Sequence, residues 1–545
     1  MKRKKELIVI LSSLLVIVLS VSVAYFTTKI LGTGKEISVE SADLKVIFTS
    51  GSGTILGSNI EPGWSSGDNT FTVKNESNGT YKYNIIIKDL VNTFVTEGFL
   101  QYKITSADGG YNMTDFVDVP KSSTATDTIL AESISIEKGA THTYKIIINY
   151  NNSDEVDQSV DMGKMLSGKI FIEKSIPKLA NKLLDDNPTI STRNDFSTTF
   201  TSNTANTLYK AIENGTDVYY FTGQDTESTP INNWVKFGKY TSTGPVIGYY
   251  SKTVNNSKLY STMSECTSAT SYKYNCTYVW KIGDDIYWRI IRTNADGSIR
   301  LLYSGVSPNA IEGYIGESKF NTNYKNPKYV GYMYGDSDTT LEEARTNTND
   351  STIKTYIDNW YENNLSSYTN YLSKDAIYCN DRELASGSDY TTSSNYFYFK
   401  PNERLNTYNN IPTPSYDCTN TKDLFSINNT EAKLKYPIAL MTADEILYAG
   451  GARGKDSLMW YYTNSTYGSI TGSTEWWLLS SSSWASSTSY NYFVYGSEYP
   501  GQLFIQDVNF SYGVRPVTSL KSCVQWKSGD GSASNPYEIV ENGGC

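Results

Sequence analysis

A basic cluster followed by a long apolar run restricts the possible folds and cellular locations of this chain more than any other feature of its sequence. Residues 2–5 are all Lys or Arg, and residues 7–26 carry no charged side chain. A helix of this length spans about 30 Å, enough to cross a bilayer, and the basic flank favours a cytoplasmic start. We therefore expect residues 1–30 to contain a transmembrane or signal helix that places the remaining chain outside the cell. Small residues at Ser22 and Ala24 permit cleavage after Ala24, so a retained anchor and secretion after cleavage are both open.

Charge and histidine content exclude several function classes. The 545 residues hold 47 Lys and Arg against 57 Asp and Glu, a net charge of -10; without the four basic residues at 2–5 the balance is 43 against 57, or -14. Such an acidic body lacks the basic surface that nucleic acids require. The single histidine, His142, removes most histidine-based triads and metal sites, and we expect it to lie exposed on a strand. We expect no cofactor and no enzymatic activity.

Six cysteines agree with an oxidising compartment. All of them follow residue 260, and none forms the C-x-x-C spacing of zinc ribbons or redox motifs. We expect sequential pairing, because short loops close at the smallest entropic cost. The expected disulfides are Cys266–Cys276, Cys379–Cys418 and Cys523–Cys545, with separations of 10, 39 and 22 residues, and six free thiols are the alternative.

Residues 36–174 show the period-two alternation of β-strands. Residues 81–88 and 144–150 alternate between a heavier and a more polar face, and turn signals such as Pro62-Gly63 and Asp108-Gly109-Gly110 separate the strands. Several short strands with such turns predict an all-β sandwich.

This part of the chain resembles the TasA and camelysin group of exported bacterial surface and biofilm-fibre proteins. The resemblance rests on Ala24-Tyr25-Phe26, on Pro62-Gly63 ahead of residues 71–75, and on a late strand that contains a glycine. It implies a jelly-roll-like sandwich, a cell-surface role and, as in some members, self-assembly into fibres.

Residues 175–214 are expected to connect two domains. Leu179 to Leu184 predict a short helix after Pro177. The stretch 187–206 is rich in Thr, Ser and Asn, which favours a linker or stalk, with an ordinary long loop as the alternative.

Residues 215–545 predict one α+β unit. Residues 286–291 and 299–303 flank a turn with Asp296-Gly297, a strong hairpin signal. Apolar residues from Ile353 to Leu365 share one helix face, and Thr442 to Glu445 form a capping box ahead of a second helix. Strands are expected again after residue 470.

Acidic residues offer two further chemistries. The pairs Asp284-Asp285 and Glu342-Glu343 could serve a glycosidase, which needs two carboxylates across a cleft, but adjacent carboxylates are also common on solvated turns. Asp336-Ser337-Asp338 and Asp530-Gly531-Ser532 have alternating oxygen donors without the full spacing of a calcium loop. Turn chemistry explains them more simply, and calcium stays open.

Aromatic residues crowd the segment from Glu475 to Tyr512 and alternate with Ser and Gly. Tyr and Trp bury much area at little entropic cost, so they suit recognition loops, and they also stack on sugar faces. Only one of Trp476 and Trp477 is expected to point inward, because neighbours on a strand face opposite sides. Trp484 lies among serines and is expected to be exposed. The expected ligand-binding residues are Trp484, Tyr490, Tyr492, Tyr495 and Tyr499.

The C-terminal part resembles an uncharacterised extracellular domain of Firmicutes, itself similar to the C-type-lectin-like fold in its formylglycine-generating branch. The resemblance rests on residues 475–480 and 512–517, with support from residues 288–291 and Asp296-Gly297. It implies a Trp-rich strand, variable loops and a closing strand, and we expect Arg515 in that strand to be structural and to bond loop carbonyls. The late paired cysteines that ligate copper in the oxidase branch and the calcium-binding tripeptides of sugar-binding lectins are both missing, so neither activity follows.

These features together predict a bacterial surface protein, membrane-anchored or secreted, that recognises a glycan or protein ligand through its C-terminal aromatic loops without catalysis. A structural fibre subunit assembled through the sandwich is the first alternative, and a carboxylate-based hydrolase is the second. On the recognition hypothesis, Trp484→Ala and Tyr492→Ala abolish binding and leave the melting temperature within a few degrees.

Overall fold

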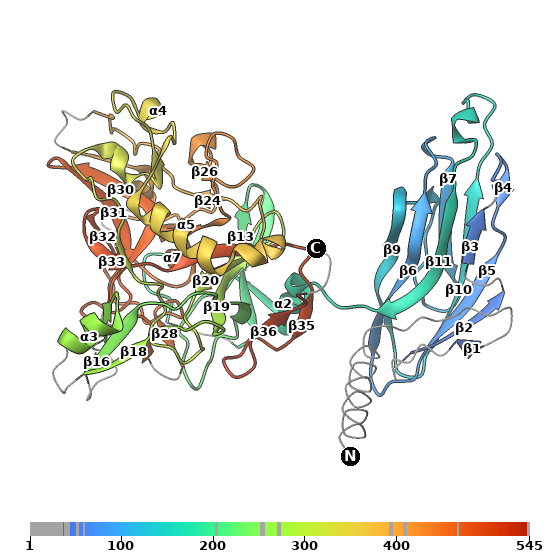
Figure 1. The fold of residues 1–545 in the computed structure, drawn as a ribbon, viewed down its shortest axis with the longest axis horizontal. Coiled ribbons are helices and arrows are strands. Elements are labelled where there is room, and N and C mark those ends of the chain that lie inside the picture. The colour runs from blue at the N-terminus through green and yellow to red at the C-terminus, as the bar shows by residue number, and fades with distance from the viewer. Residues whose placement is uncertain are drawn as a thin grey trace, which may run out of the picture. The chain divides into compact units, whose positions relative to one another are not determined.

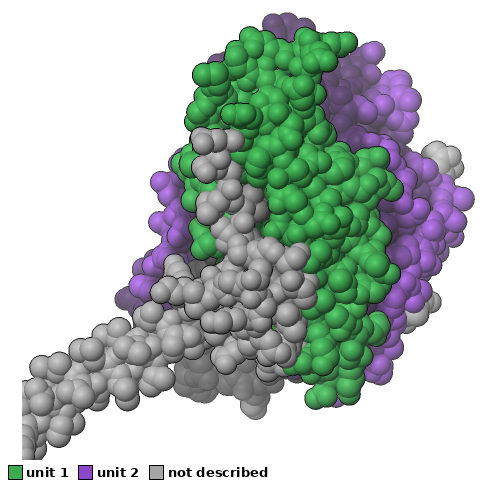
Figure 2. Space-filling model, turned by 90° about the vertical axis from the view of Figure 1, so that its right-hand side faces the viewer, with its two compact units in different colours: residues 1–176 green, residues 177–545 purple. Residues whose placement is uncertain are grey.

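The computed structural model describes residues 36–37, 44–50, 54–57, 60–201, 205–250, 257–269, 274–391, 396–406, 411–465, 468–472, 474–541 and 545. The chain forms two compact units, residues 1–176 and 177–545 (Figures 1 and 2). The predicted membrane or signal helix within residues 1–30 lies outside the described residues. Within the described ranges, no helix has the length and apolar character needed to span a membrane.

The first unit consists of two β-sheets that enclose one core. The larger sheet has the order β1 (Glu36–Ile37), β2 (Leu44–Ser50), β5 (Asn69–Asn75), β10 (Thr141–Tyr150), β7 (Leu100–Ser106) and β8 (Val117–Asp118), and β4 (Trp64–Ser65) pairs with β10. The smaller sheet has the order β3 (Thr54–Gly57), β11 (Leu166–Lys174), β6 (Tyr81–Asn92) and β9 (Ser122–Ile136), and a single helical turn, η1 (Ser159–Asp161), precedes β11. Alternate residues such as Tyr144, Ile146 and Ile148 point into the core, so the predicted β-rich, sandwich-like architecture is confirmed.

His142 lies on the inward face of β10, not on the surface. It is 6% exposed, and its Nδ1 lies 2.9 Å from the hydroxyl of Tyr83, which in turn lies 2.7 Å from the hydroxyl of Tyr144. The expectation of an exposed histidine was wrong because His142 shares the period-two register of the buried residues Tyr144 and Ile146. Burial lowers the pKa of His142, and the nearby Asp108 carboxylate opposes that shift.

The second unit is built on a large mixed sheet. Its main path is β12 (Thr189–Thr192), β13 (Thr207–Glu213), β14 (Thr216–Tyr220), β19 (Asp285–Thr293), β15 (Trp234–Lys239), β36 (Tyr537–Ile539) and β35 (Trp526–Ser528). A branch runs from β19 through β20 (Ile299–Tyr303) and β34 (Pro516–Leu520) to β27 (Ile438–Leu440). The helices of this unit are α2 (Leu179–Asp186), α3 (Met263–Ala269), α4 (Leu341–Ala344), α5 (Thr352–Asn364), α6 (Lys400–Arg404) and α7 (Ala443–Tyr448).

A second sheet of this unit carries the aromatic segment. Its order is β21 (Glu317–Lys319), β33 (Ser511–Gly513), β30 (Trp476–Ala485), β31 (Thr488–Val494) and β32 (Leu503–Asp507), and β25 (Tyr396–Tyr398) pairs with β30 (Figure 1). A smaller sheet has the order β17 (Ser257–Tyr260), β16 (Val246–Tyr250) and β18 (Tyr274–Tyr278). Three strand pairs are β22 (Met333–Tyr334) with β23 (Asn349–Asp350), β24 (Tyr378–Cys379) with β26 (Leu424–Phe425), and β28 (Thr463–Asn464) with β29 (Gly468–Ser469). The 3-10 helical turns are η2 (Pro327–Val330), η3 (Ser366–Tyr371) and η4 (Thr421–Asp423).

Local sequence signals in this unit are confirmed. β19 and β20 form the predicted antiparallel hairpin, and α5 follows the N-cap Ser351. Thr442 and Glu445 form the predicted reciprocal capping box of α7. All three sequential disulfides are present, which agrees with an oxidising extracellular environment.

Residues 189–196 of the polar stretch predicted as a linker or long loop belong to the folded second unit. Residues 189–192 form β12, which pairs in parallel with β13 at the edge of the large sheet. Arg193 donates to the carbonyl of Leu447 at 2.5 Å, and Phe196 is buried against the core. Composition alone predicted a linker because the apolar anchors of this stretch are few and lie far apart in sequence.

Arg515 has the structural role that we expected. It is fully buried, donates to the carbonyls of Tyr303 and Tyr461, and lies 4.8 Å from the ring centre of Trp476. Burial, with help from the neighbouring cation Arg289, lowers its pKa to about 9. Trp477 is also fully buried, so the expectation that only one of the two tryptophans points inward was wrong. Strand β30 is covered on both faces, and period-two alternation no longer separates core from solvent.

Candidate functional site

Trp484 lies in a small core, not on the surface. It is 2% exposed and packs with Val330, Phe397 and Phe399. The cause is β25, which pairs with β30 so that Phe397 stands opposite Trp484 and covers it. The serines that precede Trp484, residues 480–483, are themselves buried strand residues, whereas Ser486 and Ser487 form the exposed turn that follows it. The expected exposure of Trp484 was therefore wrong, and its side chain offers no surface to a ligand.

Tyr492 is also buried. It has no exposed area, and the guanidinium of Arg453 lies 5.7 Å from its ring centre. Burial raises its pKa to about 12, with Arg453 opposing the shift. Like Trp484, Tyr492 belongs to the interior in this structure.

The other three expected binding residues reach solvent but do not share one face. Tyr490 points to the same side of β31 as the buried Tyr492, whereas Tyr495 continues the opposite side after Phe493. Tyr490 and Tyr495 are partly exposed, and Tyr499, in the connection from β31 to β32, is 44% exposed.

Five aromatic side chains form a continuous, partly exposed patch on the Phe493 side of this sheet, which we call the aromatic surface. They are Tyr495, Tyr499, Phe504, Phe510 and Tyr512. Ring centres of Tyr495 and Tyr499 are 4.9 Å apart, those of Tyr495 and Phe504 5.9 Å, and those of Phe510 and Tyr512 6.2 Å.

Buried rings beneath the aromatic surface hold it together. Phe493 lies 4.6 Å from Tyr495 and 4.9 Å from Tyr512, and Trp477 lies 5.0 Å from Tyr512. Strand register produces this cluster, because Phe493 pairs with Phe504 and Trp477 pairs with Phe493. Our site prediction missed Phe504, Phe510 and Tyr512, although the alternation of the strands, once aligned as hairpins, would have placed them beside Tyr495.

Polar groups border the aromatic surface and can direct a ligand. Gln506 donates to the hydroxyl of Tyr512 at 3.2 Å, and Lys319 donates to the side-chain oxygen of Asn509 at 2.7 Å. Desolvation raises the pKa of Tyr512 to about 12; the bond from Gln506 opposes this shift, and the charge of Glu475 adds to it. Stacking rings flanked by amides and carboxylates can hold a polyhydroxylated ring on one face and bond its edge.

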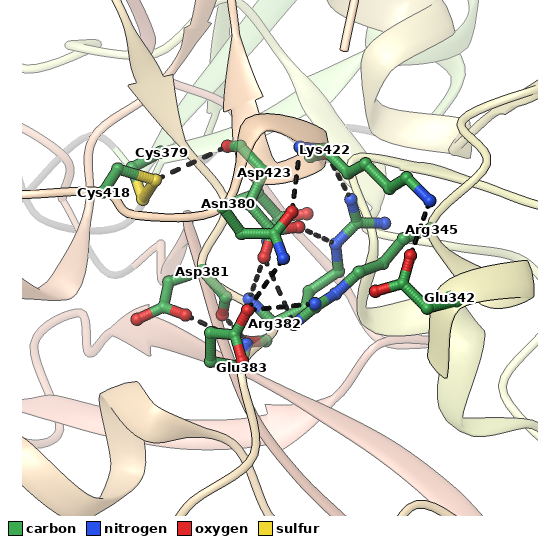
Figure 3. A network of polar contacts seen from close by, with 12 residues as sticks. Glu342, Arg345, Cys379, Asn380, Asp381, Arg382, Glu383, Cys418, Lys422 and Asp423 are labelled. Carbon is green, nitrogen blue, oxygen red and sulfur yellow. Dashed lines mark hydrogen bonds and ion pairs between the residues drawn. A yellow bond between two sulfur atoms is a disulfide. The ribbon is translucent and has the colours of Figure 1, made fainter. Parts of the chain in front are cut away.

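A group of paired charges lies elsewhere in this unit, beside the Cys379–Cys418 disulfide (Figure 3). Asp423 is 1% exposed and accepts from the Arg382 Nε at 2.7 Å and the Arg382 backbone N–H at 2.9 Å. Arg345 adds ion pairs with Asp423 at 3.4 Å and with Glu383 at 3.1 Å. Burial raises the pKa of Asp423, and both arginines oppose that shift. Because its charges neutralise one another, this network holds loops together and offers little to a ligand.

The carboxylate pairs proposed for hydrolysis are each engaged in local structure. Asp284 accepts from the backbone of Lys281 at 2.8 Å, and Asp285 pairs with Lys239. Glu342 pairs with Lys422 at 2.5 Å, and Glu343 completes the capping box of α4. Each pair therefore serves turns and caps.

The two candidate calcium loops likewise bond internally. Asp336 accepts from Asn349 at 2.7 Å, Asp338 accepts from Asn326, and Asp530 accepts from the backbone of Ser532 at 3.0 Å. Among the residues that the structure describes, no group of three or more His, Cys, Asp or Glu side chains is arranged to hold a metal ion.

A surface groove runs along the ends of β15 and β36, and most of the charged side chains that line it are paired. Lys236 and Lys527 both bind Glu538, and Lys239 binds Asp285. The aromatic surface is therefore the best candidate for recognition in the described chain.

No protein-family model, curated protein or solved structure matches this chain. Its function must therefore be inferred from the chemistry of the aromatic surface.

Proposed function

We propose that this chain is a non-enzymatic recognition protein of a bacterial cell surface, and that its C-terminal unit binds a glycan on the aromatic surface. The observation that carries this proposal is the continuous row of partly exposed rings from Tyr499 through Tyr495 and Phe504, joined through Phe493 to Tyr512 and Phe510. Aromatic side chains that are partly exposed and gathered in one place, as Phe510 is beside Tyr512, are typical of interaction sites.

A glycan fits this surface better than an apolar protein partner does. The rings are mostly tyrosines, which stack through the ring and keep a hydroxyl for hydrogen bonding. The residues next to the rings include amide and carboxylate side chains, among them Gln506, Asn509 and Glu475. Such a mixture suits sugar faces, which are apolar in the centre and carry hydroxyls at the edge.

The test is a glycan array probed with the purified, oxidised protein, with and without a calcium chelator. We expect binding that survives the chelator and is lost in Tyr499→Ala and Phe510→Ala, while Tyr278→Ala retains it. Tyr278 is a matched control because it is 36% exposed on β18, in a different sheet. Loss of binding in the chelator would indicate that the glycan binds at a calcium site and not at the aromatic surface. Absence of binding to every glycan would overturn the proposal.

Two finer assignments belong to the same proposal. A C-type-lectin-like arrangement of the second unit is supported by the Trp476-Trp477 strand, the connections that follow it and the closing strand after Arg515. A TasA-like sandwich in the first unit is supported by its two facing sheets. We propose a membrane-anchored or secreted location from the basic and apolar segments at residues 2–26 together with the disulfides.

The alternative of a fibre subunit draws on the edge of the smaller sheet. β9 is a long edge strand that pairs with β6 alone among the described strands, and such an edge can accept another chain. Its pairing with β6 has four register shifts, however, and bulges of this kind discourage edge-to-edge association. Electron microscopy of the purified protein distinguishes the two functions. Fibres would favour the role of a fibre subunit, and monodisperse particles would favour the role of a recognition protein.

A further inference from the structure

The aromatic surface has a carboxylate among its rings. Glu475 precedes β30 by one residue and lies two positions before Trp477, which places both side chains on the same side of the sheet. The Gly513 backbone N–H donates to the Glu475 carbonyl at 2.7 Å and fixes this residue beside Tyr512. Because Trp476 pairs with Val494, Glu475 falls opposite Tyr495 on the next strand. The charge of Glu475 contributes to the raised pKa of both Tyr495 and Tyr512, so Glu475 lies near both rings.

No cation neutralises Glu475 within the described part of the chain. Partial burial raises its pKa, and the charge of Glu498 raises it further. Glu317 on β21 pairs with Gly513, so its side chain stands on the opposite side of the sheet from Tyr512. Desolvation and the charge of Glu475 raise the pKa of Glu317, and Lys258 on β17 opposes that shift. Glu475 and Glu498 therefore bring two carboxylates to this end of the surface, and among the described residues neither forms an ion pair with a lysine or arginine.

The other end of the surface is closer to neutral. Lys319 donates to Asn509 at 2.7 Å, next to Phe510, whereas Asp507 pairs with Tyr490 and stands on the opposite side of the sheet. The excess of negative charge is consequently concentrated around Glu475, where Tyr495 and Tyr512 also present their rings.

We propose that the ligand of this surface carries protonated amines, and that it is a glycan with free amino sugars whose ammonium groups bind beside Glu475. This rests on the proposed glycan function and names its substrate class. An ammonium group gains from the carboxylate and from the faces of neighbouring tyrosines, which attract cations through the ring quadrupole. The same carboxylates repel glycans rich in uronate or phosphate, so the charge gives selectivity as well as attraction.

The experiment is calorimetric titration of the full oxidised chain with three probes of equal length: a β-1,4-linked glucosamine hexamer, its fully N-acetylated form, and a uronate hexamer. We expect the amine hexamer to bind roughly tenfold more tightly than the acetylated one, and the uronate to bind most weakly. Added salt should weaken the amine complex and leave the acetylated complex unchanged.

Two variants assign the preference to its source. Glu475→Gln should reduce the amine preference to within about threefold and leave affinity for the acetylated hexamer intact. Glu362→Gln, which changes an exposed glutamate on α5, is the matched control and should behave as wild type. Near-UV circular dichroism of Glu475→Gln confirms that the fold is kept.

The possible failures are distinguishable. Equal binding of the amine and acetylated hexamers, lost together in Tyr499→Ala, would keep the glycan proposal and overturn the amine inference. An amine preference that survives Glu475→Gln would overturn it as well. Binding of none of the three probes would count against both.

Discussion

Replacing Trp484 by alanine tests the corrected position of that side chain. Trp484 is 2% exposed and fills the small core formed with Val330, Phe397 and Phe399. A buried aromatic side chain removes roughly 200–250 Å² from water, which at about 25 cal/mol per Å² corresponds to about 5–6 kcal/mol. Residual burial in the unfolded chain lowers this figure to about 4 kcal/mol, inside the range of about 3–5 kcal/mol observed when large aromatic residues are truncated.

The assay is urea-induced unfolding of the oxidised protein, followed by circular dichroism. We expect Trp484→Ala to lose about 4 kcal/mol, whereas Tyr499→Ala, with 44% of its side chain already exposed, should stay within about 0.5 kcal/mol of wild type. Trp484→Ala should still bind glycan where it is folded, because Trp484 lies outside the aromatic surface. A loss below about 1 kcal/mol for Trp484→Ala would refute the packing of Trp484 against Phe397 and restore an exposed tryptophan.

Two further predictions concern buried charge and alkaline pH. Asp423→Asn should cost about 3–5 kcal/mol in urea unfolding, because it leaves the buried arginines Arg382 and Arg345 without their carboxylate. Glu362→Gln changes an exposed pair with Lys435 and should leave the urea midpoint close to that of the wild type, and equal losses in the two variants would contradict this reasoning. Burial raises the pKa of Tyr492 to about 12 from an ordinary value near 10. The folded state then holds a proton that the unfolded state releases, so this stabilisation is complete below pH ~10 and is lost as the pH rises toward ~12. Absorbance at 295 nm and circular dichroism should therefore change together in that window, and full tyrosine ionisation without loss of structure would argue against buried hydroxyls.

The elements that could be predicted from sequence are those whose cause is local. The hairpin around Asp296-Gly297 needs only a positive-φ glycine and two flanking apolar runs, and Gly297 has φ 76°. The capping box at Thr442 needs one hydroxyl and one glutamate three residues apart. The disulfides follow from short separations along the chain.

The errors come from contacts between segments far apart in sequence. Trp484 is covered by Phe397, which lies 87 positions earlier in the chain and pairs with it across β25 and β30. No pattern near Trp484 records that partner, and the serines around it imitate a loop. The aromatic surface was foreseen as a region, but its membership depends on the register of β31 with β32, which places Phe504 beside Phe493.

The first and last segments of the second unit are in contact with each other. Leu179 at the start of α2 donates its backbone N–H to Val524 at 2.8 Å, Trp526 donates to Pro177 at 2.8 Å, and Tyr537 bonds the carboxylate of Asp186 at 2.8 Å. Domains whose two ends lie together tolerate transfer into a loop of another protein, because the host needs only a short gap. We therefore expect the second unit to tolerate insertion into a loop of another protein without changes to its interior.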